Sequence, residues 1–167
     1  MSAALLDWCR DLHPVKLQAP RGTLRRRVEL PSAGGALWIE LAADLDARRA
    51  HLALPLERLP SYVAARITTA ARSLDKHEPA RREARARAGP LLLASESLDL
   101  PAAQALVDAL ARGPFQLIEA LEITLSPERC EVLAVAPSTR EEWSTLVDGV
   151  LALVGWLTRR WPPSYRM

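Results

Sequence analysis

Histidine is the side chain that most readily transfers protons or binds a transition metal near neutral pH, and three histidines occur in this chain. His13, His51 and His77 lie far apart, with no His-x-x-x-His spacing and no acidic partner at the spacing of a metal ligand set. A metal site would therefore require separate segments to converge. We interpret the three residues as surface or strand-face histidines, and we expect no metal ion or cofactor.

Paired carboxylates are the next candidates for chemistry. Asp44 and Asp46 could meet at one turn around a divalent cation, but nothing downstream completes a calcium loop, so a turn-forming pair is favoured. Glu119 and Glu122 have opposite parity in a predicted strand, so they cannot act as an acid and a base on one face. Glu119 occupies an inward position, which we interpret as a strand end or a bulge.

Motifs for nucleophilic catalysis and phosphate binding do not occur in the sequence. There is no Gly-x-Ser-x-Gly turn, and the seven glycines never form a glycine-rich phosphate loop. Cys9 and Cys130 lack Cys-x-x-Cys spacing, so we expect two reduced thiols and neither a zinc site nor a disulfide framework. The sequence favours a protein that is not an enzyme. The alternative is an enzyme or small-ligand binder with a site assembled from Asp44, Asp46, His51 and Glu119.

Arginine supplies nearly all of the positive charge, because lysine occurs only at positions 16 and 76. Two clusters, residues 25–27 and the arginines at 81, 82, 85 and 87, could contact phosphate groups. However, the formal net charge is only +2, acidic residues are interspersed, and the clusters lack the interleaved aromatics of a single-strand binder. Nucleic-acid binding is therefore a second alternative and not the favoured function.

Five tryptophans against one phenylalanine make indole the main aromatic group of the chain. Most of them fit the packing of a core or of a helix on a sheet, but Trp38 points away from its apolar neighbours in a predicted strand. If that face is exposed, Trp38 and Trp156 would mark a partner or self-association surface, since aromatics dominate interface energetics. Arg25 and Arg27 share the outward side of the preceding strand, and we predict that these four residues bind a partner.

Three predicted strands, joined as a meander, carry most of this surface. Apolar and polar side chains alternate along them with the period of half-buried strands. The paired glycines Gly34 and Gly35 predict a hairpin turn between the first two strands. The strands span residues 23–30, 37–42 and 48–54, and a short amphipathic helix over residues 2–12 precedes them.

The C-terminal part of the chain has the clearest pattern, a hairpin followed by one long helix. Residues 117–125 and 130–136 have strand-compatible patterns, and a proline-containing turn joins them. Ser138 and Glu141 have the spacing of a capping box, which predicts the start of the helix. Its apolar stripe continues to Trp161, but the apolar run is too short to cross a bilayer, which needs about 20 residues.

The central part of the chain is harder to interpret. From residue 61 to residue 74 the apolar spacing changes to that of a helix. The arginine-rich segment 75–90 has no apolar stripe, so we expect either a solvated helix over residues 80–88 or a mobile loop. After this segment we predict a short strand over residues 91–94 and a helix over residues 101–111 capped by Asp99.

We predict a single α+β domain over residues 1–167. The long helix and the shorter helices pack against an antiparallel sheet made of the three-strand meander and the C-terminal hairpin. Hydrophobic residues at 49% and charged residues at 25% are ordinary for a globular domain. The tail, residues 162–167, is expected to be extended. The first residues lack the basic start and long apolar run of a signal peptide, so we expect cytoplasmic residence and no membrane span.

The order of elements, a helix, a three-strand meander, a helix, a hairpin and a long capped helix, resembles that of the small type III secretion chaperones and related CesT/YbjN-like proteins. This resemblance covers most of the chain and implies a homodimer that binds an extended segment of a protein partner. The strand at residues 91–94 with the elements that follow it is also similar to uncharacterised proteins of GC-rich bacteria. We therefore predict a protein-interaction module, adaptor or chaperone-like, that uses a sheet face or edge and the terminal helix.

Overall fold

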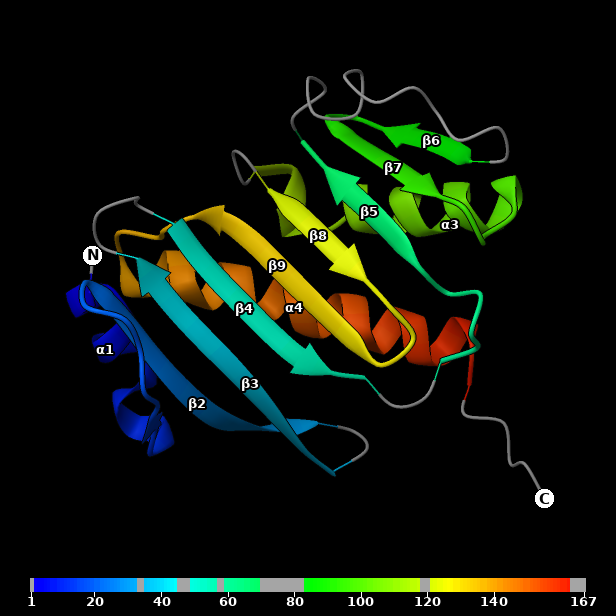
Figure 1. Cartoon of the computed structure of the whole chain (residues 1–167). Coiled ribbons are helices and arrows are strands. Elements are labelled where there is room, and N and C mark those ends of the chain that lie inside the picture. Colours follow the sequence, from blue (N-terminus) through cyan, green and yellow to red (C-terminus); the bar gives the residue numbers. More distant parts are fainter. Residues whose placement is uncertain are drawn as a thin grey trace.

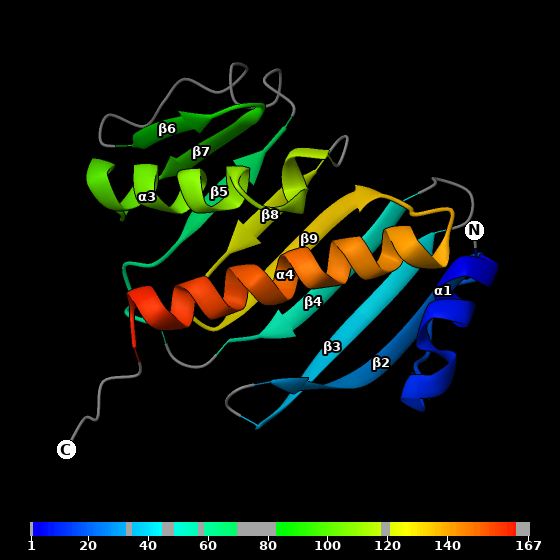
Figure 2. The ribbon, with the colours of Figure 1, turned by 180° about the vertical axis from the view of Figure 1, so that it is seen from behind.

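The computed structural model describes residues 2–32, 35–44, 49–56, 59–69, 83–117 and 121–162. Within these residues, nine strands form one antiparallel sheet, and helices lie against one of its two faces (Figure 1 and Figure 2). The order of the strands across the sheet is β1-β2-β3-β4-β9-β8-β5-β7-β6. The prediction of an α+β fold, with an antiparallel sheet packed by helices, is confirmed.

The longest strands belong to the meander at one end of the sheet. The strands are β1 (Val15–Lys16), β2 (Thr23–Ser32), β3 (Gly35–Asp44), β4 (Arg49–Pro55), β5 (Ala65–Thr68), β6 (Ala84–Ala88), β7 (Leu91–Ser95), β8 (Glu122–Leu125) and β9 (Arg129–Val135). The helices are α1 (Ser2–Cys9), α3 (Leu100–Ala111) and α4 (Arg140–Arg160), and the short 3-10 helices are η1 (Arg10–Leu12) and η2 (Pro114–Leu117).

The meander and the C-terminal hairpin meet at the centre of the sheet. β2, β3 and β4 pair in sequence, and the antiparallel pairing of β4 with β9 joins them to the β8–β9 hairpin. Ile39, Leu41, Leu52 and Leu54 are buried at alternate positions of β3 and β4, because successive residues of a strand point to opposite faces. The predicted meander and the predicted hairpin are therefore both confirmed.

Helices close one face of the sheet, which we call the covered face. α4 crosses over β9 and β4 on this face, and α3 lies against β6 and β7 (Figure 2). The apolar stripe of α4 is buried, including Trp143, Val150 and Leu157, as its helical spacing predicts. α1 packs on α4, where Nε1 of Trp8 donates a hydrogen bond to Oγ of Ser144 at 3.3 Å. The apolar residues of both helices and of the strands form one core.

The N-terminal cap of α3 is confirmed, whereas the cap of α4 lies one residue later than predicted. Asp99 Oδ1 accepts a hydrogen bond from the backbone N–H of Ala102 at 2.8 Å. In α4 the cap is Thr139 and not Ser138, because Thr139 Oγ1 accepts from the N–H of Glu142 at 3.2 Å. The Glu142 carboxylate accepts from the N–H of Ser138, the residue before the cap, at 2.7 Å, in an arrangement similar to a capping box. Both serine and threonine can cap, so the sequence allowed either register.

The segment after Ser61 contains a strand and not the predicted helix. β5 pairs with β8 on one side and β7 on the other, with Ala65 and Ile67 buried and Arg66 exposed. The apolar residues at 63, 65 and 67 also fit a period of two. A segment this short therefore matches a helix or a strand, and pairing with two neighbouring strands decides between them. Residues 70–74 of the predicted helix lie outside the described residues.

A strand also replaces the helix or loop predicted in the arginine-rich segment. In β6, Ala86 is buried beside α3, whereas Arg85 and Arg87 are exposed on the other face. Alanine and arginine favour helices intrinsically, but the pairing of β6 with β7 and the contact with α3 override that preference. Residues 75–82 of the segment lie outside the described residues.

The strand predicted over residues 117–125 is too long. β8 occupies only its last four residues, and the first residue belongs to η2. The reason is the packing of Phe115, which is 1% exposed and lies under α4 beside Gly149, so the chain turns before it enters the sheet. Glu119 lies outside the described residues, and the interpretation of that residue as a strand end or bulge stays a prediction.

Candidate partner-binding surface

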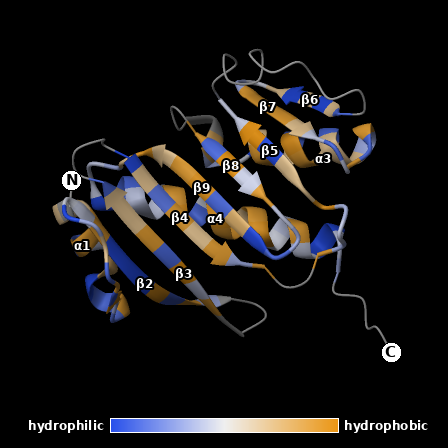
Figure 3. Ribbon diagram, viewed as in Figure 1, coloured by the Kyte–Doolittle hydropathy of each residue, from blue (hydrophilic) through white to orange (hydrophobic). Residues whose placement is uncertain are grey.

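The second face of the sheet has no helix against it in the described part of the chain, and we call it the open face (Figure 1). Its residues follow from the register of the strands, since side chains that are direct partners across a ladder point to the same face. Figure 3 shows hydrophilic and hydrophobic residues interspersed along β4 and β9, the central strands of this face. Two cross-strand rows of the open face are Arg27, Glu40, Ala53, Glu131, Thr124 and Arg66, and Arg25, Ala42, His51, Leu133, Glu122 and Thr68.

Four large apolar side chains are exposed on the open face. Val15, Trp38 and Leu133 are 39–40% exposed and Val135 is 49% exposed. Single exposed apolar residues are ordinary, but several on one uncovered sheet face are typical of a surface that binds another molecule. The other large apolar residues that are exposed in the described residues, Leu6, Tyr62 and Leu100, lie on α1, a loop and α3.

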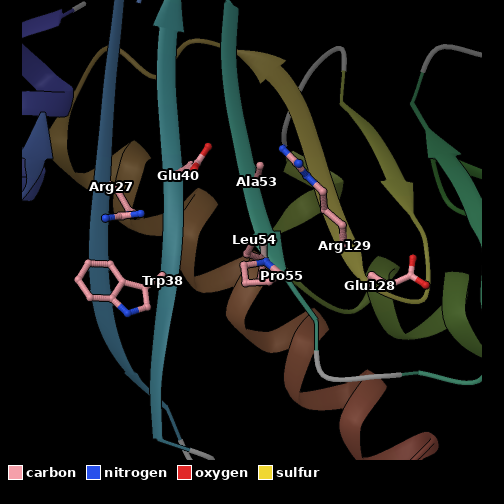
Figure 4. A pocket seen from close by; sticks show the side chains of 8 residues that line it. All are labelled: Arg27, Trp38, Glu40, Ala53, Leu54, Pro55, Glu128 and Arg129. Carbon is pink, nitrogen blue, oxygen red and sulfur yellow. The ribbon is translucent and has the colours of Figure 1, made fainter. Parts of the chain in front are cut away.

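A depression of about 390 Å³ lies on the open face, where β2, β3 and β4 pass the turn between β8 and β9. Figure 4 shows Arg27 and Trp38 on one side of it and Arg129 on the other, with Ala53 and Pro55 between them. The depression is open to solvent, so a bound chain could continue beyond it in either direction. Its lining residues are Arg27, Trp38, Glu40, Ala53, Leu54, Pro55, Glu128 and Arg129.

Trp38 is held at the rim of this depression by an arginine from the neighbouring strand. The guanidinium carbon of Arg27 lies 5.1 Å from the centroid of the Trp38 ring, which is a cation–π contact. The contact is possible because Arg27 and Trp38 are near neighbours on the same face of the β2–β3 ladder, in which Arg27 is the direct partner of Glu40. The indole therefore has a preferred orientation although 40% of it is exposed.

The charged groups around the depression are mostly paired with one another. Arg25 Nη2 lies 3.3 Å from Glu40 Oε2, and Arg129 Nη2 lies 3.1 Å from Glu131 Oε1. His51 Nε2 lies 3.9 Å from the same Glu131 oxygen. These pairs are exposed, so each contributes little to stability, but together they leave the rim close to neutral.

The structure brings together three of the four residues that sequence reasoning selected for partner binding. Arg25, Arg27 and Trp38 lie on the open face within two adjacent strands. Trp156 lies on α4, on the opposite side of the sheet, where it is partly buried and meets Trp161 edge to face with ring centroids 5.9 Å apart. Trp156 therefore belongs to a different surface from the other three.

Leu133, Val135 and Arg129 are open-face residues that sequence reasoning missed. In β9 the inward positions Cys130 and Val132 are buried, and the outward positions between and after them are also partly apolar. Because both sides of this strand carry apolar residues, its hydropathy alone does not separate the two faces. The alternation of the paired strand β4, in which His51 faces outward, is the signal that could have assigned them.

The candidate catalytic residues do not converge in the described part of the chain. His51 is on the open face, His13 is exposed after η1 with a left-handed φ of 51°, and Asp44 ends β3. His77, Asp46 and Glu119 lie outside the described residues. Among the residues that the structure describes, no group of three or more His, Cys, Asp or Glu side chains could hold a metal ion.

The run of three arginines at residues 25–27 is divided between the two faces of the sheet. Arg26 lies in the inward row and donates a hydrogen bond through Nη1 to the backbone oxygen of Arg25 at 2.8 Å. Arg25 and Arg27 point to the open face instead. The period of a strand thus prevents this run from acting as one basic patch.

Comparison with known proteins identifies a structural neighbour. No protein-family model matches the chain, and no curated protein matches it. The crystal structure of the mycobacterial trehalose monomycolate transport factor A, TtfA, is similar with a TM-score of 0.62 at 15% sequence identity, over 98% of this chain and 97% of that one. The fold is therefore shared over nearly the full length of both chains. No helix in the described residues combines the length and apolar character needed to span a membrane.

Proposed function

We propose that this protein is a non-enzymatic interaction module that holds a protein partner on the open face of its sheet, around Trp38. The observation that carries the proposal is the exposed Trp38 indole at the rim of the 390 Å³ depression, on a face that no described helix covers. α4 has a supporting role in this proposal, because it closes the covered face of the sheet.

The chemistry of the surface supports a protein partner. A tryptophan that is partly exposed but fixed by a neighbouring arginine can bury a large area with little loss of side-chain entropy, which is typical of interface hot spots. Leu133 and Val135 extend the apolar surface across β9. The exposed ion pairs of this face, Arg25 with Glu40 and Arg129 with Glu131, resemble the polar rim of an interface.

The structural neighbour is compatible with an accessory role. TtfA is named as a transport factor, a description that does not require catalysis by that chain. We propose by analogy that the present chain also acts through binding, and that it is an adaptor or chaperone-like protein. The homodimer implied by the resemblance to type III secretion chaperones is part of the same proposal.

Affinity capture from a lysate of the source organism tests the proposal. The bait is the tagged protein, and the variants are Trp38→Ala and, as a matched control, Tyr62→Ala, which removes an aromatic ring that is 49% exposed outside the sheet. We expect a protein that is retained by the wild type and by Tyr62→Ala and lost with Trp38→Ala. The captured protein is then purified, and its affinity for the three baits is measured by calorimetry.

If the wild type and Trp38→Ala bind the purified protein equally well, the open face around Trp38 is not the binding surface. Binding of small molecules in place of any protein would favour the alternative, a small-ligand binder. Circular dichroism of both variants shows whether they are folded, so that loss of binding is not confused with loss of structure.

A further inference from the structure

Arg27 differs from Arg25 and Arg129, the neighbouring arginines, in its ion pairing. Arg25 is paired with Glu40 at 3.3 Å and Arg129 with Glu131 at 3.1 Å. Arg27 makes no ion pair within the described residues, although Glu40 is its direct partner across the ladder. Its guanidinium lies on the Trp38 ring instead, at 5.1 Å. In the described part of the chain, this exposed positive charge thus has no carboxylate within ion-pair distance.

Within the described residues, the Arg27 side chain donates no hydrogen bond, so its donors are available to another molecule. A guanidinium has five N–H donors that lie in its plane, whereas the cation–π contact uses the charge above the ring. The same plane matches the two oxygens of a carboxylate, which arginine binds in a bidentate manner. Arg27 is therefore arranged to receive one carboxylate group from another molecule.

Apolar groups lie near Arg27 in the depression, in addition to its cross-strand partner Glu40. Trp38 lies on the same side of the depression as Arg27, and Ala53 and Pro55 lie between this side and Arg129 (Figure 4). A ligand that brings a carboxylate to Arg27 would place its neighbouring group on this apolar floor. The complementary chemistry is an acidic group directly beside an apolar one.

The size of the depression fits a short extended segment. Neighbouring strands lie about 4.8 Å apart, so the three steps from β2 to β9 span roughly 14 Å, the length of about four extended residues. A stable protein dimer usually buries roughly 800 Å² on each partner. Such an interface uses about 20–30 residues a side, whereas eight residues line the depression, so a short segment fits it better than a second copy of the chain.

We propose that the depression binds an extended segment of the partner protein in which an acidic residue is adjacent to a large apolar residue. The carboxylate pairs with Arg27, and the apolar side chain packs on Trp38, Ala53 and Pro55. This inference rests on the proposed function, since it specifies the chemistry of the segment that the open face recognises.

An mRNA-display library of random decapeptides tests the inference, with the purified full-length protein as the immobilised target. The target proteins are the wild type, Arg27→Glu, Trp38→Ala and Arg87→Glu. Arg87 is an exposed arginine on β6, at the far end of the sheet, so its variant makes the same charge change away from the depression. Arg27→Gln serves as a second variant if Arg27→Glu does not fold.

We expect the wild type and Arg87→Glu to enrich peptides in which Asp or Glu stands beside a large apolar residue. Arg27→Glu should lose these peptides and enrich a basic residue at the same position. For a single enriched peptide, Arg27→Gln should weaken binding by about tenfold, as expected for removal of one charged partner at an interface.

The two levels of the proposal fail in different ways. Peptides that depend on Trp38 but carry no acidic residue would overturn the inference and leave the proposed function intact. Equal losses with Arg27→Glu and Arg87→Glu would also overturn it, because they would show only general charge attraction. No enrichment by the wild type, or enrichment that Trp38→Ala does not change, would contradict the proposed function itself.

Discussion

Replacement of Gly149 by alanine tests how closely α4 packs on the turn before β8. A Cβ atom at this position would lie 3.0 Å from Cγ of Pro114 and 3.1 Å from Cε1 and Cζ of Phe115. Phe115 is 1% exposed, so its ring has little space into which it can move. Forcing one extra carbon into a packed core costs about 1–3 kcal/mol.

A second glycine in the same helix provides the matched control. At Gly155 an added Cβ would meet only Nη1 of Arg159, at 3.3 Å, and the end of an exposed arginine can move aside. Exchange of glycine for alanine inside a helix stabilises by about 0.8–1.0 kcal/mol, and both variants have this gain. We therefore expect Gly155→Ala to be more stable than the wild type, and Gly149→Ala to be less stable than Gly155→Ala by about 1–3 kcal/mol.

Urea denaturation followed by far-UV circular dichroism measures this difference. The free energies of unfolding are compared for the wild type and the two variants, and the slopes show whether the unfolding transition has stayed the same. A Gly149→Ala variant as stable as Gly155→Ala would refute the close contact between α4 and η2 on which the position of β8 depends.

Three further predictions concern the cap of α4 and the buried thiols. Thr139→Ala should lower the free energy of unfolding by about 0.5–2 kcal/mol, because it removes the side chain that caps the helix. Ser138→Ala should lower it by less, because the backbone N–H of residue 138 still reaches Glu142. Urea titrations of both variants measure the two differences. Hydrogen bonds from Ser138 and Thr139 lower the pKa of the Glu142 carboxyl, so its stabilisation is present above the ordinary pKa and is lost as the pH falls through the folded value. The stability difference between the wild type and Glu142→Gln should therefore shrink in urea titrations at pH 3 relative to pH 7. Burial raises the pKa of the Cys130 thiol to about 12, so it should not react with Ellman's reagent at pH 8 until guanidinium unfolds the protein, and rapid reaction in the native state would contradict its burial.

The meander and the terminal helix could be predicted because local pattern and tertiary structure agree there. In β3, Ile39 and Leu41 alternate with Trp38 and Glu40, and the described helices cover only one face of that strand. In α4 the apolar stripe is continuous over the length of the helix. Where the local pattern and the buried face coincide, the sequence alone is sufficient.

β5 and β6 could not be predicted because non-local pairing determines them. β5 is four residues long and lies between strands from two other parts of the chain, so its own spacing holds too little information. β6 consists of alanine and arginine, which favour helices, and becomes a strand through its pairing with β7 and its contact with α3. Such pairings depend on residues distant in sequence.

Part of the candidate surface could be predicted from the sequence, because it lies on strands whose alternation is clear. Strand parity places Arg25, Arg27 and Trp38 together, since direct partners across a ladder share a face. Trp156 could not be assigned in this way, because the side of the sheet that α4 covers is decided by tertiary packing. The depression itself depends on the approach of the β8–β9 turn to β4, which no local pattern encodes.

Site-specific photocrosslinking tests most directly whether the open face is the binding surface. A photoreactive phenylalanine analogue replaces either Leu133, which is 40% exposed on the open face, or Leu100, which is 57% exposed on α3. The protein is produced in its source organism, irradiated in intact cells and recovered by its tag. We expect a crosslinked product of higher mass from position 133 and none from position 100. Crosslinks formed only from position 100 would contradict the account, because they would place the partner on the helical side of the molecule.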